Sequence, residues 1–326
     1  MESSKLRELE PVGVGLRVTT SPTQTAFYII LVLLGIVGNT TVIGVILDSV
    51  FKDPSGVRNS DIILMNMALS NLLVSVLRNV LLVISDLADG CHILMGVWVW
   101  LRSVNVWSTL FLSAFHFQTL RRVAPSPGTV HGPRRPPKTL LISLGLIWFL
   151  NLIYAIPAHI YSTKGNNNST ETLMLVSSTT RPLLGCVWNF PSSYNGLAYA
   201  TTSMVIHEIL PIILMAITNL GSLYTLYTHG RTRNPAHMTQ DAPVIKRIPA
   251  ERRAAKVILA LIVLFIGSWG TSIISINYFN YNRGLSAGFL LVIARFANTI
   301  FIAISPIVLA LGHRRLRAVI KSFLTH

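Results

Sequence analysis

The stretch SNLLVSVLRNVLLVIS, residues 70–85, is almost wholly apolar but contains one arginine, Arg78. Together with the residues from 61 onward, the run has the length of about 20 residues that a helix needs to cross the ~30 Å hydrocarbon core of a bilayer. An ionisable side chain inside such a span is costly, and it faces the interior of a helix bundle or water rather than lipid. The stretch therefore predicts a membrane-spanning helix that belongs to a larger bundle.

The composition of the whole chain agrees with a membrane protein. Of its 326 residues, 51% are hydrophobic and 12% are charged, whereas about 25% are charged in a typical soluble domain. The net charge of +15 does not indicate nucleic-acid binding, because the basic residues lie mainly between apolar runs and form no basic helix with base-reading polar residues. The segment MESSKLRELEPVG, residues 1–13, has no apolar core, so we expect no cleaved secretory signal.

Seven apolar segments reach the spanning length, and breakers rich in Pro and Gly, such as KDPSG at 52–56, separate them. Each is a helix rather than a barrel strand, because barrel strands have about 10 residues and alternate in polarity. The predicted spans are residues 24–47, 61–85, 93–120, 139–161, 196–228, 254–280 and 286–311. The predicted fold class is an all-α membrane protein, with a seven-helix transmembrane domain over 24–311, an outer N-terminal segment 1–23 and a cytoplasmic tail 312–326.

The positions of Lys and Arg predict the orientation. With the N-terminus outside, 18 of these residues lie in the inner loops and tail and 6 in the outer parts, and short inner loops carry such an excess. We therefore expect a multi-pass plasma-membrane protein with its N-terminus outside and its C-terminus inside. The tail sequence GHRRLRAVIKSFL, residues 312–324, places Leu316, Val319, Ile320 and Phe323 on one side. This pattern predicts a short amphipathic helix on the inner leaflet lipids.

Two features of the outer segments agree with this orientation. Asn167 and Asn168 lie in NNNST and both fit the glycosylation pattern. The only two cysteines, Cys91 and Cys186, also fall on the outer, oxidising side, which predicts a disulfide between them rather than two unrelated buried thiols.

Motifs in the spans show a family resemblance. The cysteine at the top of the third span and its partner in the second outer loop are accompanied by the GN pair at 38–39, MALSNLL at 67–73 and single residues in later spans. Those residues are Trp148, Pro211 and Pro306. The combination resembles the rhodopsin-like receptors coupled to G proteins, with Asn71 where an Asp is usual and Pro306 within SPIVL rather than N-P-x-x-Y.

The departures from that family narrow the resemblance. The third span ends in FHFQTLRR at 115–122 rather than D-R-Y, and the sixth contains IGSWGTS at 266–272 without a proline. With SVLRN and LRRVAP, the chain looks like the vomeronasal type-1 receptors and the related fish olfactory receptors. The resemblance implies a pheromone or olfactory receptor that activates a heterotrimeric G protein of the inhibitory or another class. The predicted G-protein contacts are His116, Arg121 and Arg122.

The polar residues inside the spans predict a ligand site. Helical spacing puts them on narrow inward faces, and at 1.5 Å per residue Arg78, Arg102, Arg295 and Glu208 all lie in the outer half of the bundle. The surplus of positive charge favours a small anion, most simply a carboxylate held by bidentate arginine contacts. The residues predicted to contact ligand are Arg78, Arg102, Asn105, His207, Glu208 and Arg295.

Other interpretations of this layer remain open at the level of sequence. The arginines can belong to a structural polar network, and His207 can be a satisfied interior histidine. Glu208 can form a salt bridge with an arginine and set the inactive packing, or it can bind an amine. A transporter or channel could use the Arg/Glu layer as a substrate site, although paired repeats and broken helices are not evident. We expect no cofactor, metal site or enzymatic activity, because no span carries a metal cluster or a nucleophile–base pair.

Overall fold

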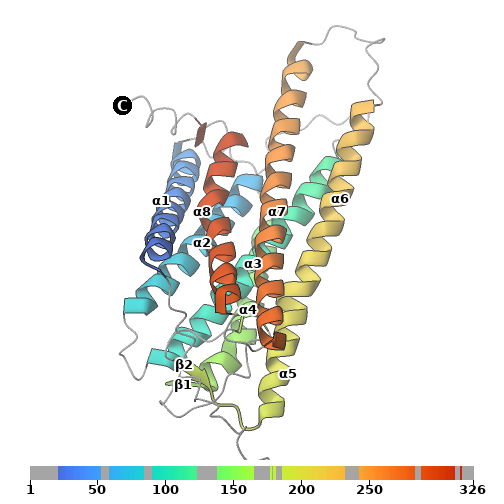
Figure 1. Cartoon of the computed structure of the whole chain (residues 1–326). Helices are drawn as coiled ribbons and strands as arrows, with labels where there is room; N and C mark the ends of the chain where they lie inside the picture. The colour runs from blue at the N-terminus through green and yellow to red at the C-terminus, as the bar shows by residue number, and fades with distance from the viewer. Residues whose placement is uncertain are drawn as a thin grey trace, which may run out of the picture.

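The protein forms a bundle of seven spanning helices with one small β-hairpin (Figure 1). The computed structural model describes residues 21–52, 59–83, 90–122, 138–164, 177, 179–180, 186–231, 242–282, 288–312 and 316–317. The helices are α1 (Pro22–Lys52), α2 (Asn59–Val83), α3 (Cys91–Arg122), α4 (Lys138–Ile160), α5 (Ser193–Met204), α6 (Leu210–Arg231), α7 (Ala242–Asn282) and α8 (Gly288–Gly312). A π-helical turn, Val205–Ile209, joins α5 and α6 into one continuous spanning helix.

The observed helices confirm the seven predicted spans, and most of their ends fall within a few residues of the predicted ends. The largest difference is at α7, which begins at Ala242 rather than at the predicted residue 254. The hydropathy of a sequence identifies only the part of a helix that lies in lipid. The polar segment before residue 254 continues the same helix, which Figure 1 shows extending beyond the ends of α8 and α1.

The β-hairpin marks the outer end of the bundle. Strands β1 (Ser162–Lys164) and β2 (Cys186–Trp188) pair antiparallel, with Thr163 opposite Val187, at the bottom of Figure 1. Cys91 at the start of α3 forms a disulfide with Cys186 of β2, which confirms the predicted pair. Because disulfides persist on the oxidising side of a membrane, this end of the bundle faces outward, as the distribution of basic residues predicts.

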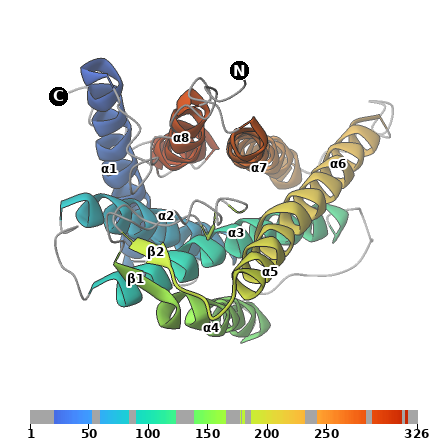
Figure 2. The ribbon, with the colours of Figure 1, turned by 60° about the horizontal axis from the view of Figure 1, so that its bottom comes forward.

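Helix α3 occupies the interior of the bundle. It contacts α2, α4, α6 and α7, and the view from the outer end in Figure 2 shows it between these neighbours. Six described helical segments are apolar enough to span a membrane by composition, and α3 is not among them. Its buried polar residues are Arg102, Ser103, Asn105, Ser108, Thr109 and Ser113. A helix surrounded by protein can carry such residues, because protein groups rather than lipid face them.

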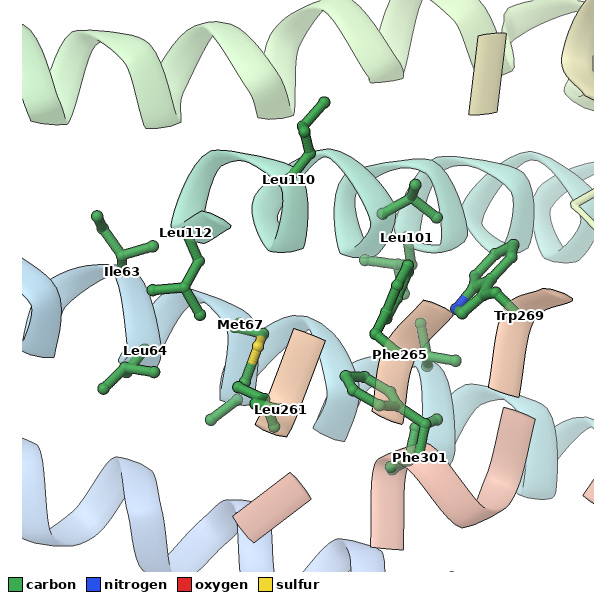
Figure 3. Packing of buried hydrophobic residues seen from close by; sticks show 14 of the residues in the cluster. Ile63, Leu64, Met67, Leu101, Leu110, Leu112, Leu261, Phe265, Trp269 and Phe301 are labelled. Carbon is green, nitrogen blue, oxygen red and sulfur yellow. The ribbon is translucent and has the colours of Figure 1, made fainter. Parts of the chain in front are cut away.

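The buried apolar residues of α2, α3, α7 and α8 interlock along the inner side of this helix (Figure 3). Met67 of α2, Phe265 of α7 and Phe301 of α8 are fully buried, and the rings of Phe265 and Phe301 meet edge to face with centroids 4.9 Å apart. In lipid, apolar burial alone does not favour helix association, so close packing and interhelical hydrogen bonds hold these helices together.

Helices α1 and α8 approach closely where a proline interrupts the hydrogen bonds of α8. Pro306 has no N–H for the carbonyl of Ile302 one turn earlier, and the Asn39 side-chain amide donates to that carbonyl at 3.1 Å. Next to Asn39, a Cβ atom at Gly38 would lie 2.9 Å from Pro306 Cβ and Cγ. The GN pair therefore serves two purposes: the glycine allows the close approach and the asparagine satisfies the carbonyl.

Replacing Gly38 by valine should destabilise the bundle, because the new side chain collides with the rigid Pro306 ring. Overpacking of this kind costs about 1–3 kcal/mol. Gly44→Val on the same helix is the matched control, since nothing lies within 4 Å of a Cβ atom there. Thermal unfolding of the purified protein should show a lower Tm for Gly38→Val than for Gly44→Val. Equal Tm values would contradict the close approach.

Candidate ligand-binding site

The second outer loop inserts into the bundle from its outer end. Ser177, Thr179 and Thr180 are each wholly buried, although they lie between two spanning helices in the sequence. Trp188 of β2 donates its indole N–H to the Thr180 carbonyl at 3.0 Å, and the Cys91–Cys186 disulfide attaches β2 to α3. The disulfide and the tryptophan together hold this part of the loop inside the bundle.

The loop is bonded directly to Glu208, the carboxylate predicted to lie in the outer half. Glu208 Oε1 accepts from Ser177 Oγ at 2.7 Å and from the Thr179 backbone N–H at 2.8 Å. The side chain is 0% exposed, and within the described residues its second oxygen, Oε2, has no hydrogen-bond partner. A buried carboxylate oxygen without a partner is costly, so this atom is the natural place for an additional donor.

A π-helical turn explains how the fifth spanning helix presents two neighbouring side chains inward. His207 and Glu208 are both buried, and both lie in the turn Val205–Ile209, where the Leu210 N–H bonds to the Val205 carbonyl. Pro211 follows at once and has no N–H to continue the α-helical pattern. The wider turn admits one extra residue, and such turns are frequent at functional sites.

Arg102 lies in the same outer layer as Glu208. Its side chain is 3% exposed, and its guanidinium carbon lies 4.3 Å from the centre of the Trp269 ring and 5.3 Å from that of Trp98. It is also close enough to Glu208 to interact with it electrostatically. Arginine stacks on aromatic faces while leaving the edge of its planar fork available for hydrogen bonding. The stacked guanidinium therefore puts a positive charge in this layer, next to the Glu208 carboxylate.

A series of rings continues inward from Arg102. Trp269, on which the guanidinium lies, stacks on Phe265 one turn away with centroids 5.4 Å apart. Phe265 meets Phe301 of α8 edge to face, and Figure 3 shows the three rings in succession. A change in the position of Arg102 thus reaches α7 and α8 through direct contacts.

Two other predicted ligand residues bond to protein groups. A ring nitrogen of His207, Nε2, lies 3.0 Å from the Asn151 side-chain oxygen, and its ring is 4.2 Å from that of Tyr154, so it faces α4. Asn105 donates to Ser70 Oγ at 3.1 Å and to Asn71 Oδ1 at 2.6 Å.

These bonds make Asn105 part of a polar network. Asn71 also lies within hydrogen-bond distance of Asn39 and Ser305, at 3.5 and 3.4 Å. The network links α1, α2, α3 and α8, and the side-chain amides of its asparagines hydrogen-bond to one another. Ligand contact by His207 or Asn105 stays a prediction.

The remaining two arginines of the predicted layer differ from Arg102. The Arg295 guanidinium carbon lies 4.1 Å from the centre of the Tyr28 ring of α1, whereas Arg102 packs against α7. The side chain of Arg78 lies outside the described residues, although its backbone is part of α2. The structure therefore brings Arg102 and Glu208 together, and it places Arg295 at the contact of α8 with α1.

At the inner end of α3, the residues predicted to contact a G protein lie next to Phe117, where α3 and α6 pack closely. His116 is half-buried, and its Nε2 has no hydrogen-bond partner within the described residues. Arg121 is exposed and lies over the Phe117 ring at 5.7 Å. A Cβ atom at Gly221 of α6 would approach Phe117 to 2.6 Å, so α6 fixes the ring beside His116.

Several predicted features involve residues outside the part of the chain that the structure describes. The Arg122 side chain, Asn167, Asn168 and most of the tail lie outside the described residues. In the tail, Leu316 is buried and Arg317 donates to the Leu311 carbonyl. The amphipathic helix and the glycans stay predictions.

Some residues of the site were not predicted from the sequence. Trp98 lies one helical turn before Arg102, and that spacing could have identified it. Trp269 lies in the IGSWGTS segment, and nothing in the sequence around it indicates a contact with an arginine. Ser177 and Thr179 carry no periodic signal, because they belong to a loop.

Replacing Glu208 by alanine should release the inserted loop. The change removes the acceptor of two hydrogen bonds, each worth about 1.5–3 kcal/mol when one partner is charged. Hydrogen exchange at the Thr179 amide should accelerate by about tenfold or more. Glu208→Gln keeps a carbonyl oxygen as acceptor and should show a smaller increase. Unchanged exchange in Glu208→Ala would show that the hydrogen bonds to Glu208 do not hold the loop in place.

These observations define the class of protein. A seven-helix bundle with an outer disulfide from α3 to the second outer loop, and with a polar layer beneath that loop, has the architecture of a seven-transmembrane receptor. The family model described as "7 transmembrane receptor (rhodopsin family)" matches residues 38–299. The chain belongs to this family.

Relatives of the chain are also receptors. It is 42% identical over 303 residues to "Olfactory receptor class A-like protein 4" of Danio rerio. The aligned region covers 90% of this chain and 88% of the relative. It is 25% identical over 252 residues to "Apelin receptor A" of Danio rerio, covering 74% and 62% of the two chains. It is 23% identical over 269 residues to "Neuropeptide Y receptor type 6" of Oryctolagus cuniculus, covering 78% and 65%.

Family membership confirms the coarse predictions from the sequence. The protein is a multi-pass receptor of the plasma membrane and not an enzyme. As a member of the G protein-coupled class it has a ligand and a G protein as partners. The findings favour a receptor over the transporter or channel alternative.

Proposed function

We propose that this protein is a chemosensory receptor that binds a small organic acid between Arg102 and Glu208 and activates a heterotrimeric G protein. The observation that carries the proposal is a buried arginine stacked on two tryptophans beneath a loop that is bonded to a buried carboxylate. The chemosensory role is supported by the olfactory relative, which is 42% identical.

The chemistry of the layer supports an anionic ligand. The fork of a guanidinium matches the two oxygens of a carboxylate and can bind both at once. The Trp98 and Trp269 rings beside Arg102 offer aromatic walls to the apolar part of an acid. Glu208 Oε2 can accept from a hydroxyl or amide on the same ligand. An acid that also carries such a donor satisfies both groups.

The ring series suggests how the ligand acts on the helices. A carboxylate that binds Arg102 competes with the face of Trp269 for the positive charge. A shift of Arg102 toward the acid weakens its contact with Trp269 and changes the packing of Phe265 against Phe301. A ligand shifts a two-state bundle only through such differential contacts. We propose that the inner cleft then opens to a G protein at His116, Arg121 and Arg122.

Matched ligands test the proposal. Purified receptor in phosphatidylcholine nanodiscs, with a purified G protein, should accelerate nucleotide exchange in response to aromatic and steroid-like acids. The primary alcohols and amines of the same skeletons should be much weaker. Equal potency of the alcohols, or a response to amines alone, would overturn the anion site. Ligand uptake or current without any G protein would overturn the receptor mechanism.

A further inference from the structure

A second candidate site lies on the membrane-facing side of the bundle. An open groove of about 790 Å³ runs along α8, between the outer end of α1 and the middle of α7. In Figures 1 and 2, α8 lies between α1 and α7. Its lining includes Phe27 of α1, Val263 and Gly267 of α7, and Ile293 and Phe296 of α8. Its size falls in the range of about 300–1,000 Å³ that small-molecule sites have.

The walls of the groove face lipid rather than the bundle interior. Phe27 is 51% exposed, Val263 57% and Ile293 39%, and all three belong to spanning helices. The lining is mostly apolar. Phe27 and Phe296 stack across the α1–α8 contact with centroids 5.8 Å apart. An apolar body from the outer leaflet therefore finds a concave apolar surface here.

A positive charge lies close to this groove, on Arg295, the residue that precedes Phe296 of the lining in α8. Arg295 is half-buried and sits over Tyr28, whose ring meets Phe296 edge to face at 6.0 Å. Among the described residues, no carboxylate forms a salt bridge with Arg295; the salt bridge found there joins Lys52 and Asp48. A cation in a span without an anionic partner is costly, and an anion bound beside it lowers that cost.

The depth of Arg295 selects the kind of anion. It lies seven residues after Gly288, the start of α8, or ~10 Å below the outer helix end. A phospholipid keeps its phosphate at the interface. A single-chain carboxylic acid can be carried to this depth in its neutral form and lose its proton next to the guanidinium.

We propose that this groove binds an amphiphilic carboxylic acid from the outer leaflet, with its chain along α7 and α8 and its carboxylate on Arg295. This site is distinct from the proposed acid site at Arg102, and it makes the receptor responsive to membrane-dissolved amphiphiles. It goes beyond the proposed function, because the two sites use different arginines on different helices.

Gly267 provides a direct way to fill the groove. It lies in the wall of the groove, and a Cβ atom there would meet nothing within 4 Å. Gly267→Phe should therefore occupy the space without a clash. Gly145 of α4 is also exposed and open, and it lies outside the lining, so Gly145→Phe is the matched control.

Photolabelling tests the proposal with the full chain in phosphatidylcholine nanodiscs. The probe is palmitic acid that carries a diazirine and an alkyne, compared with hexadecanol and phosphatidylcholine that carry the same groups. The acid should label peptides that contain residues 263–271 or 292–300, and unlabelled palmitate should compete. Arg295→Gln should lower acid labelling to about a tenth, the effect of losing one charge-assisted contact. Gly267→Phe should lower it at least as far, because the new ring occupies the space of the acyl chain. Gly145→Phe and Arg102→Ala should leave it unchanged.

The same experiment identifies the results that would overturn the site. Equal labelling by the alcohol or by phosphatidylcholine would show that the groove holds any acyl chain. Undiminished acid labelling in Gly267→Phe would place the acid elsewhere. Failure of unlabelled palmitate to compete in the unmodified receptor would show that there is no saturable site, whatever the folding of the variants. Loss of labelling in Arg102→Ala would assign the acid to the proposed site between Arg102 and Glu208 instead.

Discussion

Replacing Arg102 by alanine should raise the acid concentration for half-maximal G-protein activation by at least about 30-fold, because losing one partner of a buried charge contact costs about 2–5 kcal/mol. The variant removes the guanidinium that contacts the rings of Trp98 and Trp269, and with it the charge that would meet a carboxylate. Nucleotide exchange on a purified G protein, measured against a series of acids, gives the shift. Cell-surface labelling shows whether the variant reaches the membrane.

Arg102→Lys is the matched control for charge and geometry. Lysine keeps the positive charge but lacks the planar fork that binds two oxygens and stacks on rings. Its potency should lie between those of the unmodified receptor and of Arg102→Ala. If Arg102→Ala reaches the surface and responds to every acid with unchanged potency, Arg102 is not a ligand contact.

Replacing Cys91 by serine should lower the stability of the receptor by about 2–5 kcal/mol, the usual effect of removing a native disulfide. The bond joins residues 95 apart in sequence and holds β2, and with it the inserted loop, against α3. Surface expression and the Tm of purified protein should both fall. Hydrogen exchange at Thr179 should rise, because the loop loses an anchor near its end.

The double variant Cys91→Ser, Cys186→Ser separates loss of the bond from exposure of a free thiol. Its Tm should equal that of either single variant, since all three lack the same bond. A single variant with normal Tm and normal exchange at Thr179 would show that hydrogen bonds to Glu208 hold the loop by themselves.

The spans could be predicted from the sequence because their signal is local. A run of apolar residues must cross the bilayer as a helix, whatever its neighbours are, and basic residues near the inner ends set the orientation. The disulfide could be predicted because the chain has two cysteines and the orientation puts both outside. The same local rule missed the inner extension of α7, where residues 242–253 are helical without being in lipid.

The contacts of the buried polar residues could not be predicted from local sequence patterns. Spacing along α3 shows that Arg102 and Asn105 face inward, but it does not say which helix each one meets. In the structure Arg102 lies on Trp269 of α7, while Asn105, less than one turn away, bonds to Asn71 of α2. Arg295 turns to Tyr28 of α1. The neighbour of each side chain depends on how helices distant in sequence are rotated against each other.

The sequence by itself determined the number and direction of the helices, the cysteine pair and the presence of buried charge in the outer half. Each follows from the energetic cost of polar groups in lipid, which acts on every segment separately. Only the tertiary structure decided that Ser177 and Thr179 fold inward onto Glu208 and that α1, α7 and α8 line an open groove. Loop insertion and concave surfaces arise from contacts between segments far apart in the chain, and no periodicity within one segment encodes them.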